Sequence, residues 1–298
     1  MHKQQPLAYF EEASSAEVVN SRMAPDVAPR TRQIMEALVR HLHAAVKEIE
    51  PTHEEWLAAI GFLTETGQIC SDWRQEYILL SDILGVSMLV DAINHRRPSA
   101  ATPNTILGPF YVTGAPEYPA GANICLDGKG EPMIVAGTVR GIDGEPVAGA
   151  RLEVWQTNDD GFYDVQQQGI QPENNLRGVF TTDAQGRYWL QSVKPRHYPI
   201  PDDGPVGKLL RRLGRHPNRA AHLHFIVTAP GYVPVITHIF TPDCQYLAED
   251  TVFGVKRELV ANFVRIDDAA RARDLGTTAP YWQVDWDFTL APQTAETL

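Results

Sequence analysis

His222, Leu223 and His224 form the segment of this sequence that is best suited to metal chemistry. Successive side chains of a strand point to opposite faces, so both imidazoles would lie on one face and Leu223 on the other. Two neutral imidazoles placed in this way supply half of the ligands of a typical metal site. Two polar residues on a solvated strand face are the alternative, but the apolar residues 225–227 that follow argue against it.

Three further side chains have the right chemistry for a reactive site. Arg219 lies three residues before His222 and carries a permanent positive charge. Tyr163 follows the turn-rich run 158–161, and Tyr198 lies in the proline-rich segment 195–201. A single tyrosine is usually an ordinary amphipathic residue with its hydroxyl in water, so only the combination of these residues carries an argument.

The elements that position these residues change in kind near residue 105. Apolar residues recur every three to four positions from 34 to 49, which predicts an amphipathic helix. Thr52 and Glu55 have the spacing of a capping box and predict a second helix that ends at about residue 70. The apolar run 73–94 predicts a third helix, which ends before Pro98.

From Thr105 onward, frequent turn residues and alternating apolar residues predict strands. The expected strand pairs are 133–139 with 150–157, 179–182 with 187–193, and 221–228 with 235–240, followed by a helix over 251–263 and a strand over 282–290. The predicted fold class is therefore α+β. An amino-terminal helical domain over residues 1–104 precedes an antiparallel β-sandwich domain over residues 105–298.

Composition excludes several classes of protein. The chain has 298 residues with 26 Lys and Arg against 37 Asp and Glu, and the net charge of −11 disfavours nucleic acid as a partner. No apolar run approaches the roughly 20 residues that a membrane span requires. Three widely spaced cysteines predict neither a disulfide framework nor a cysteine metal site, and with no apparent signal peptide they indicate a cytoplasmic protein.

A pattern that begins in the first predicted strand and ends just after the second resembles the signature of intradiol ring-cleavage dioxygenases. The similarity begins at residues 135–139, includes Gly144, Val147 and residues 152–154, and ends at residues 161–163. Tyr198 and the histidine pair then follow where this family places its other metal ligands. The helical segment is typical of the branch that cleaves catechol and hydroxyquinol, whereas protocatechuate dioxygenases lack it.

The resemblance implies that Tyr163, Tyr198, His222 and His224 bind one Fe(III) per subunit. Phenolate oxygens are hard anionic donors that favour the ferric ion, which suits this ligand set. It further implies that an aromatic diol displaces Tyr198 from the iron, that Tyr198 takes up a substrate proton, and that O2 opens the ring to give a muconate. Arg219 matches the arginine with which the family stabilises negative charge on the ring.

The resemblance also implies a substrate pocket in which Asp82 selects the substrate. A carboxylate in an otherwise apolar lining costs free energy unless it has a partner, and a third ring hydroxyl would supply one. The hydroxyquinol branch resembles this chain in having Asp at this position, and residues 202–207 and 214–217 also resemble that branch. Benzene-1,2,4-triol is therefore the expected substrate, and 3-hydroxymuconate, the enol form of maleylacetate, the expected product. The pocket residues implied are Leu79, Asp82, Ile106, Leu107, Gly108, Pro109, Phe110, Ile200, Pro201, Arg219 and His238.

Five points stay open at this level. Catechol or a chlorocatechol is the alternative substrate, and His238 stands where catechol dioxygenases have glutamine, so its role is undecided. Zinc or another metal is an alternative occupant of the histidine pair. Residues 137–155 also suit a transthyretin-like binding sandwich without enzymatic activity. The resemblance implies a homodimer through the helical domain that holds a phospholipid, although helix packing alone would explain the apolar stripes.

Overall fold

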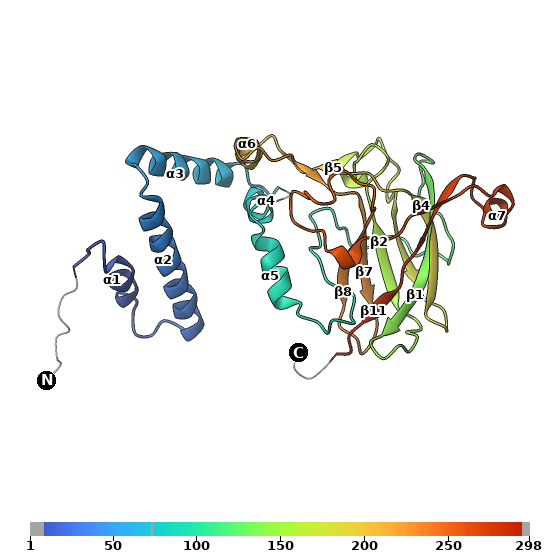
Figure 1. Cartoon of the computed structure of the whole chain (residues 1–298), viewed down its shortest axis with the longest axis horizontal. Coiled ribbons are helices and arrows are strands. Elements are labelled where there is room, and N and C mark those ends of the chain that lie inside the picture. The colour runs from blue at the N-terminus through green and yellow to red at the C-terminus, as the bar shows by residue number, and fades with distance from the viewer. Residues whose placement is uncertain (1–8, 73, 294–298) are drawn as a thin grey trace. The chain divides into compact units, whose positions relative to one another are not determined.

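The computed structural model describes residues 9–72 and 74–293 and divides the chain into two compact units, Met1–Glu65 and Thr66–Leu298 (Figure 1). Within the described residues, the first unit is helical and the second contains every strand. The boundary between the two compact units therefore falls inside the third helix. The predicted boundary at residues 104 and 105 instead marks the change from helices to strands.

The first unit contains α1 (Ser15–Ser21), α2 (Pro29–Ile49) and most of α3 (His53–Gln68). α2 and α3 confirm the first two predicted helices, whereas α1 was not predicted. The capping box is also confirmed, because the Glu55 N–H donates to Thr52 Oγ1 at 3.2 Å and the Thr52 N–H donates to Glu55 Oε2 at 2.8 Å.

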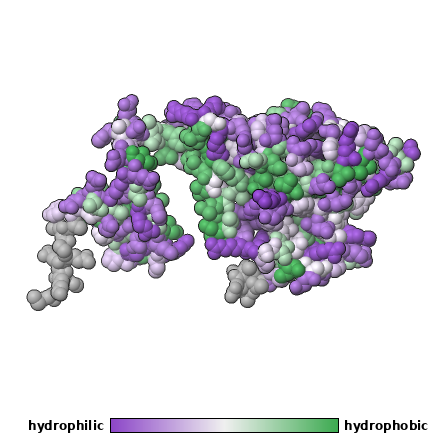
Figure 2. Space-filling view, viewed as in Figure 1, coloured by the Kyte–Doolittle hydropathy of each residue, from purple (hydrophilic) through white to green (hydrophobic). Residues whose placement is uncertain are grey.

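The prediction of one helix over residues 73–94 is wrong, because two helices occupy this segment. α4 (Glu76–Ile83) and α5 (Val86–Asn94) are separated at Gly85, whose φ of 72° ends the first helix. Apolar residues continue across the break, so periodicity alone did not reveal it. Figure 2 shows apolar side chains over α4 and α5, where Ile78, Leu89 and Ile93 are each more than half exposed.

The strands form two larger sheets and one small one. The five-stranded sheet contains β1 (Pro132–Gly141), β4 (Arg187–Val193), β9 (Val264–Ile266), β10 (Tyr281–Asp285) and β11 (Phe288–Leu290). The four-stranded sheet has the order β3 (Arg177–Thr181), β2 (Arg151–Trp155), β7 (His222–Thr228) and β8 (Val235–Phe240), and every pair in it is antiparallel. β5 (Tyr198–Pro199) pairs with β6 (Asn218–Arg219).

Only one of the three predicted hairpins, β7 with β8, is confirmed. β1 and β2 lie in different sheets, and so do β3 and β4. After β1 the chain turns and the Val147 N–H donates to the Val139 carbonyl at 2.9 Å, but β2 then joins the other sheet. Turn residues and alternation have the same signature whether a chain returns to its own sheet or crosses to another, so the sequence did not separate the two cases.

The carboxyl-terminal part departs from the prediction in two ways. The strand expected over 282–290 is divided into β10 and β11, both parallel to β1, so the five-stranded sheet is mixed rather than purely antiparallel. The helix expected over 251–263 is absent; only the short 3-10 helix Arg257–Leu259 forms there. The Asp250 side chain accepts from the Gly254 N–H at 2.7 Å and Phe253 has a φ of 59°, so a side-chain-bonded turn replaces the helix.

The remaining elements are α6 (Pro205–Arg212), the unpredicted α7 (Ala269–Asp274) and the 3-10 helix Asp164–Gln166. One large core cluster includes buried residues from both larger sheets, among them Val135 of β1 and Leu223 of β7. In the part of the chain that the structure describes, no helix is long and apolar enough to cross a membrane.

Candidate active site

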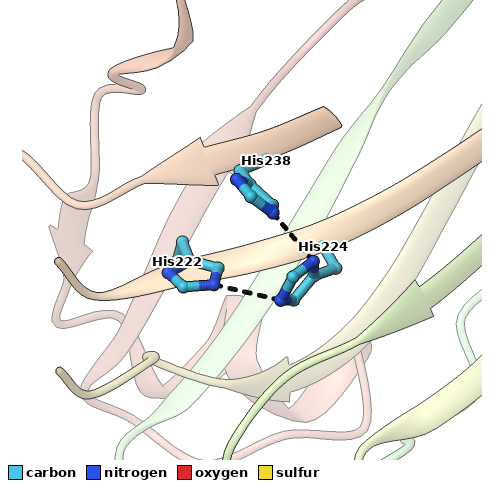
Figure 3. Close-up of side chains that lie close together, drawn as sticks. All are labelled: His222, His224 and His238. Carbon is cyan, nitrogen blue, oxygen red and sulfur yellow. Dashed lines mark hydrogen bonds between the residues drawn. The ribbon is translucent and has the colours of Figure 1, made fainter. Parts of the chain in front are cut away.

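The two faces of β7 have different surroundings. Leu223, Phe225 and Val227 are fully buried in the main core. His222 and His224 lie together on the other face, as their spacing predicts, and their Nε2 atoms are 3.1 Å apart. His238 of β8 stands opposite His224 in the strand register and completes a cluster of three buried histidines (Figure 3).

The two predicted tyrosines join this cluster. Tyr163 Oη lies 2.9 Å from His224 Nε2 and 3.3 Å from Tyr198 Oη, and both phenols are buried. The four predicted ligand side chains, which span 61 positions of sequence, therefore converge on one small region.

A turn places Tyr163 beside Tyr198. The Asn158 side-chain oxygen accepts from the Phe162 N–H at 2.9 Å, and Gly161 has a φ of 83°. A Cβ at Gly161 would lie 3.2 Å from the His197 carbonyl oxygen and 3.3 Å from Tyr198 Cβ. Glycine is required there both by the backbone conformation and by the close approach of the second tyrosine.

Hydrogen bonds determine which ring nitrogens of the histidines face the phenols. His222 Nδ1 lies 2.6 Å from the Ala220 carbonyl, which can only accept, so the proton is on Nδ1 and Nε2 has a lone pair. His224 Nδ1 lies 2.8 Å from His238 Nε2, and His238 Nδ1 lies 3.1 Å from Thr105 Oγ1. If His224 donates from Nδ1 along this chain, its Nε2 is also free to bind a cation.

The charges of the cluster agree with this arrangement. Burial, together with the positive charge of Arg219, holds the pKa of His222 well below its usual range. Burial and the neighbouring His238 and His222 do the same to the pKa of His224. Both imidazoles are therefore neutral, and their facing lone pairs repel one another unless a cation lies between them.

The donor set fits a hard metal ion. Donor atoms that bind one metal at about 2 Å lie about 3 Å apart, which is the separation of the imidazole nitrogens and phenol oxygens here. Burial, and then the neighbouring Tyr198, raises the pKa of Tyr163 well above its ordinary value. A phenolate therefore forms at Tyr163 only when a cation compensates for that cost, and ferric iron is the ion that two phenolates favour.

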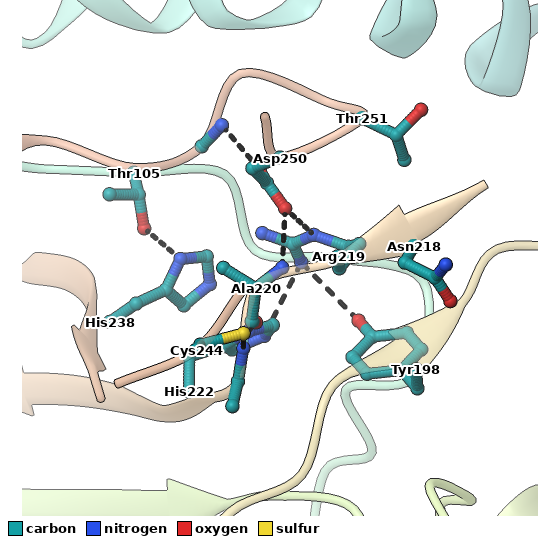
Figure 4. A network of polar contacts seen from close by, with 12 residues as sticks. Thr105, Tyr198, Asn218, Arg219, Ala220, His222, His238, Cys244, Asp250 and Thr251 are labelled. Atoms are coloured by element: carbon teal, nitrogen blue, oxygen red, sulfur yellow. Dashed lines mark hydrogen bonds and ion pairs between the residues drawn. The ribbon is translucent and has the colours of Figure 1, made fainter. Parts of the chain in front are cut away.

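Arg219 is the fixed cation of the site (Figure 4). Its Nη1 donates to Tyr198 Oη at 3.3 Å and lies 3.4 Å from His222 Nε2, because Arg219 and Tyr198 are opposite each other in the β5–β6 pair. Burial would lower the pKa of Arg219, but Tyr198, Asp250 and Tyr163 together raise it, so the guanidinium stays charged. Within the described residues, its Nε and Nη2 have no hydrogen-bond partner.

Asp82, near the end of α4, is half-buried. Burial raises the pKa of its carboxyl group, while a hydrogen bond with Ser87 and the charge of Arg219 oppose that shift. A carboxylate whose charge is disfavoured by burial gains from any further hydrogen-bond donor. The position is therefore suited to recognise a hydroxyl group.

Three other predicted pocket residues contact the cluster. Phe110 stacks on Tyr163 with ring centroids 4.7 Å apart, and Leu107 packs against the aromatic cluster that includes Tyr163 and Tyr198. A Cβ at Gly108 would lie 3.3 Å from His224 Cε1, so a side chain there would crowd the imidazole. For the others the structure shows burial alone, and their place in a pocket stays a prediction: Leu79 and Ile106 are half-buried, Ile200 is buried, and Pro109 and Pro201 are exposed.

Sequence reasoning missed two residues of the site. Trp155 stacks on His224 with ring centroids 4.4 Å apart and planes inclined by 11°, because β2 pairs with β7 and brings the two residues into register. Asp250 lies beside Arg219, with 3.5 Å between Oδ1 and Nε. Alternation along β2 places Trp155 on the face away from the core residues Leu152 and Val154, and this pattern could have identified it. No pattern in the sequence pointed to Asp250.

Comparison with known proteins identifies the class. Residues 106–292 match the family described as Dioxygenase, and residues 28–102 match the one described as Catechol dioxygenase N terminus. The chain belongs to the intradiol ring-cleavage dioxygenases, which are iron-dependent enzymes. Family membership excludes the binding sandwich without activity and makes iron the metal that this site fits.

Three individual proteins are similar to this chain over nearly its whole length. Hydroxyquinol 1,2-dioxygenase of Rhizobium sp. (strain MTP-10005) is 63% identical over 284 residues, which cover 95% of this chain and 96% of that protein. 6-Chlorohydroxyquinol 1,2-dioxygenase of Cupriavidus pinatubonensis is 47% identical, with 95% and 98% covered. The crystal structure of hydroxyquinol 1,2-dioxygenase from Pseudomonas putida DLL-E4 matches with a TM-score of 0.90 at 45% identity, covering 95% of this chain and 99% of that one.

Proposed function

We propose that this enzyme cleaves benzene-1,2,4-triol with O2 between its two adjacent hydroxyl-bearing carbons and forms 3-hydroxy-cis,cis-muconate, the enol form of maleylacetate. The observation that carries the choice of substrate is Asp82, a half-buried carboxyl group within the electrostatic influence of Arg219. A third ring hydroxyl that donates to Asp82 would offset the cost of its burial. The 63% identical relative named hydroxyquinol 1,2-dioxygenase supports the same choice.

We assign one Fe(III) per subunit to Tyr163, Tyr198, His222 and His224. The convergence of their donor atoms at 2.9 to 3.3 Å supports this ligand set. When bound, ferric iron would be chelated by the two adjacent hydroxyl groups of the substrate and would make the ring reactive toward O2. Trp155 and Phe110, stacked on His224 and Tyr163, hold two of these rings in place.

The chain's own groups have separate roles in the reaction. Tyr198 Oη accepts a proton from one substrate hydroxyl, and Arg219 Nη1, which already faces that oxygen, stabilises the charge that the proton leaves behind. Asp82 orients the ring through its third hydroxyl. The aromatic rings around Tyr163 restrict the access of water to the site.

The visible spectrum of the purified protein tests this function. A ferric tyrosinate protein should have an absorption band in the visible range that shifts when benzene-1,2,4-triol is added without oxygen. Oxygen should then convert the triol to the ring-opened product faster than it converts catechol. A colourless protein that takes up no iron contradicts the assignment, and a preference for catechol or a chlorocatechol makes that diol the substrate.

We propose that His238 orients His224 rather than contacting the substrate, since its Nε2 lies 2.8 Å from His224 Nδ1. Replacing His238→Leu removes the acceptor and should accelerate loss of iron to a chelator by about 10- to 100-fold. His238→Gln, which keeps an acceptor, should lose iron at close to the wild-type rate. Unchanged iron retention in His238→Leu with a raised KM for the triol would instead place His238 in the substrate pocket.

The helical part is proposed to form a homodimer contact. Along α2 the residues Ile34, Leu38, Leu42, Val46 and Ile49 are between 48% and 71% exposed, and the helix has no buried residue. Introducing Leu38→Asp and Leu42→Asp together should halve the mass measured by sedimentation equilibrium. Arg40→Asp, a matched change on the other face of α2, should leave the mass unchanged. A wild-type chain that sediments as a monomer refutes the dimer.

Four further proposals accompany this one. The same apolar stripe is suited to acyl chains, and solvent extraction followed by mass spectrometry tests for the expected phospholipid.

The two larger sheets contribute to one core, which supports the β-sandwich as the catalytic domain over residues 105–298. Residues 1–104 then form the helical dimerisation domain. Three free cysteines in the described chain support a cytoplasmic location, which cell fractionation would test.

A further inference from the structure

The Asp250 carboxylate makes a dense set of contacts beside the site. Its side chain is 1% exposed. Oδ1 accepts from the Ala220 N–H at 2.9 Å, and Oδ2 accepts from the Gly254 N–H at 2.7 Å (Figure 4). These bonds hold the carboxylate between the loop that follows residue 250 and the start of β7.

Arg219 meets this carboxylate with one edge of its guanidinium group. Nε lies 3.5 Å from Asp250 Oδ1, while Nη1 faces Tyr198 Oη and His222 Nε2. A Cβ at Gly254 would lie 2.8 Å from Arg219 Nη2 and 3.1 Å from Asp250 Oδ2. The loop therefore approaches the guanidinium so closely that a side chain at residue 254 would displace it.

We infer that Asp250 is a positioning residue that holds the guanidinium of Arg219 toward Tyr198 and the reacting ring. The inference rests on the proposed function, because Arg219 acts on the substrate only if the ring binds beside Tyr198. Asp250 does not touch the substrate. Its backbone bonds fix the carboxylate, which attracts the Nε edge as an ion pair without a hydrogen bond. The opposite edge is thereby turned toward the phenol.

A purely structural role for Asp250 is the competing explanation. The same loop is held elsewhere, because Arg215 donates to the Thr251 carbonyl at 2.7 Å and stacks on the Phe253 ring at 4.8 Å. If Asp250 only anchors the loop, its removal should act independently of Arg219. If it positions Arg219, the two substitutions should be coupled.

A double-mutant cycle on the iron-loaded full-length enzyme separates these roles. Asp250→Asn keeps the shape, removes the charge and replaces one of the two acceptor oxygens with an NH2 group. It should lower kcat by about 30- to 100-fold with little change in KM. Arg219→Met should lower kcat by about 100- to 1000-fold. In the Arg219→Met background, Asp250→Asn should lower kcat by less than threefold, because the guanidinium that Asp250 positions is gone.

Thermal unfolding supplies a readout that does not depend on activity. Arg219→Met leaves the Asp250 carboxylate buried without its cation and should lower the Tm by about 5 °C. Adding Asp250→Asn should recover part of that loss. The exposed Asp267→Asn is the matched control and should change neither kcat nor the Tm in either background.

Coupling in both measurements supports the positioning role. Additive losses in kcat, with no recovery of the Tm in the double variant, overturn it and make Asp250 a loop anchor. If the wild-type enzyme cleaves neither the triol nor catechol, the proposed function fails. The thermal cycle still decides whether Asp250 and Arg219 form a pair.

Discussion

Replacing His224→Ala should abolish iron binding and the visible absorption band and should lower turnover of the triol by at least roughly 1000-fold. His224 lies at the centre of the cluster, since its Nε2 faces Tyr163 and His222 while its Nδ1 meets His238. Alanine removes the nitrogen ligand that we propose at the centre of the cluster, together with the ring on which Trp155 stacks. Iron content by atomic absorption and the visible spectrum measure the first effect.

Two controls make this result specific to the site. His41→Ala changes an exposed histidine of α2 and should retain full iron content and activity. Circular dichroism should show that the His224→Ala protein keeps its strands, because the core face of β7 consists of Leu223, Phe225 and Val227. A folded His224→Ala protein that binds iron at wild-type stoichiometry would remove His224 from the ligand set.

Replacing Asp82→Ala should reverse the substrate preference of the enzyme. The wild-type carboxyl group is half-buried, and the third hydroxyl of the triol supplies a donor that catechol lacks. Losing this bond should lower kcat/KM for the triol by about 100-fold, because a hydrogen bond to a charged group contributes about 1.5 to 3 kcal/mol. The value for catechol should stay the same or rise, because catechol has no third hydroxyl to donate to the half-buried carboxyl group. Steady-state oxygen uptake with both substrates measures the ratio.

Asp82→Asn is the matched variant for this experiment. It keeps an acceptor oxygen of the same size and should retain more of the triol activity than Asp82→Ala does. Equal losses for the triol and catechol in Asp82→Ala would show that Asp82 supports the fold rather than the choice of substrate. Measuring the Tm of both variants separates that outcome from a general loss of stability.

Short-range chemistry made much of the site predictable. The HxH spacing on a strand put His222 and His224 on one face, because alternation is a local property of extended backbone. The capping box at Thr52 was likewise readable, since both partners lie within one helical turn. The resemblance added Tyr163 and Tyr198, which have no distinctive local pattern of their own.

Long-range contacts were outside the reach of the sequence. Two of three predicted hairpins were wrong because a turn does not encode whether the next strand joins the same sheet. The helix expected over 251–263 was wrong because the Asp250 side chain bonds the Gly254 N–H and holds a turn instead.

The sequence by itself thus determined that His222 and His224 share one face of a strand, because alternation acts over a few residues, whereas Tyr163, Tyr198 and Asp82 entered through the resemblance. Their arrangement depended on tertiary structure. Strand register places both Trp155 and His238 beside His224. A loop 31 positions after Arg219 brings Asp250 to the guanidinium. Such contacts join segments that are distant along the chain, and the free energy that selects them comes from packing the whole core.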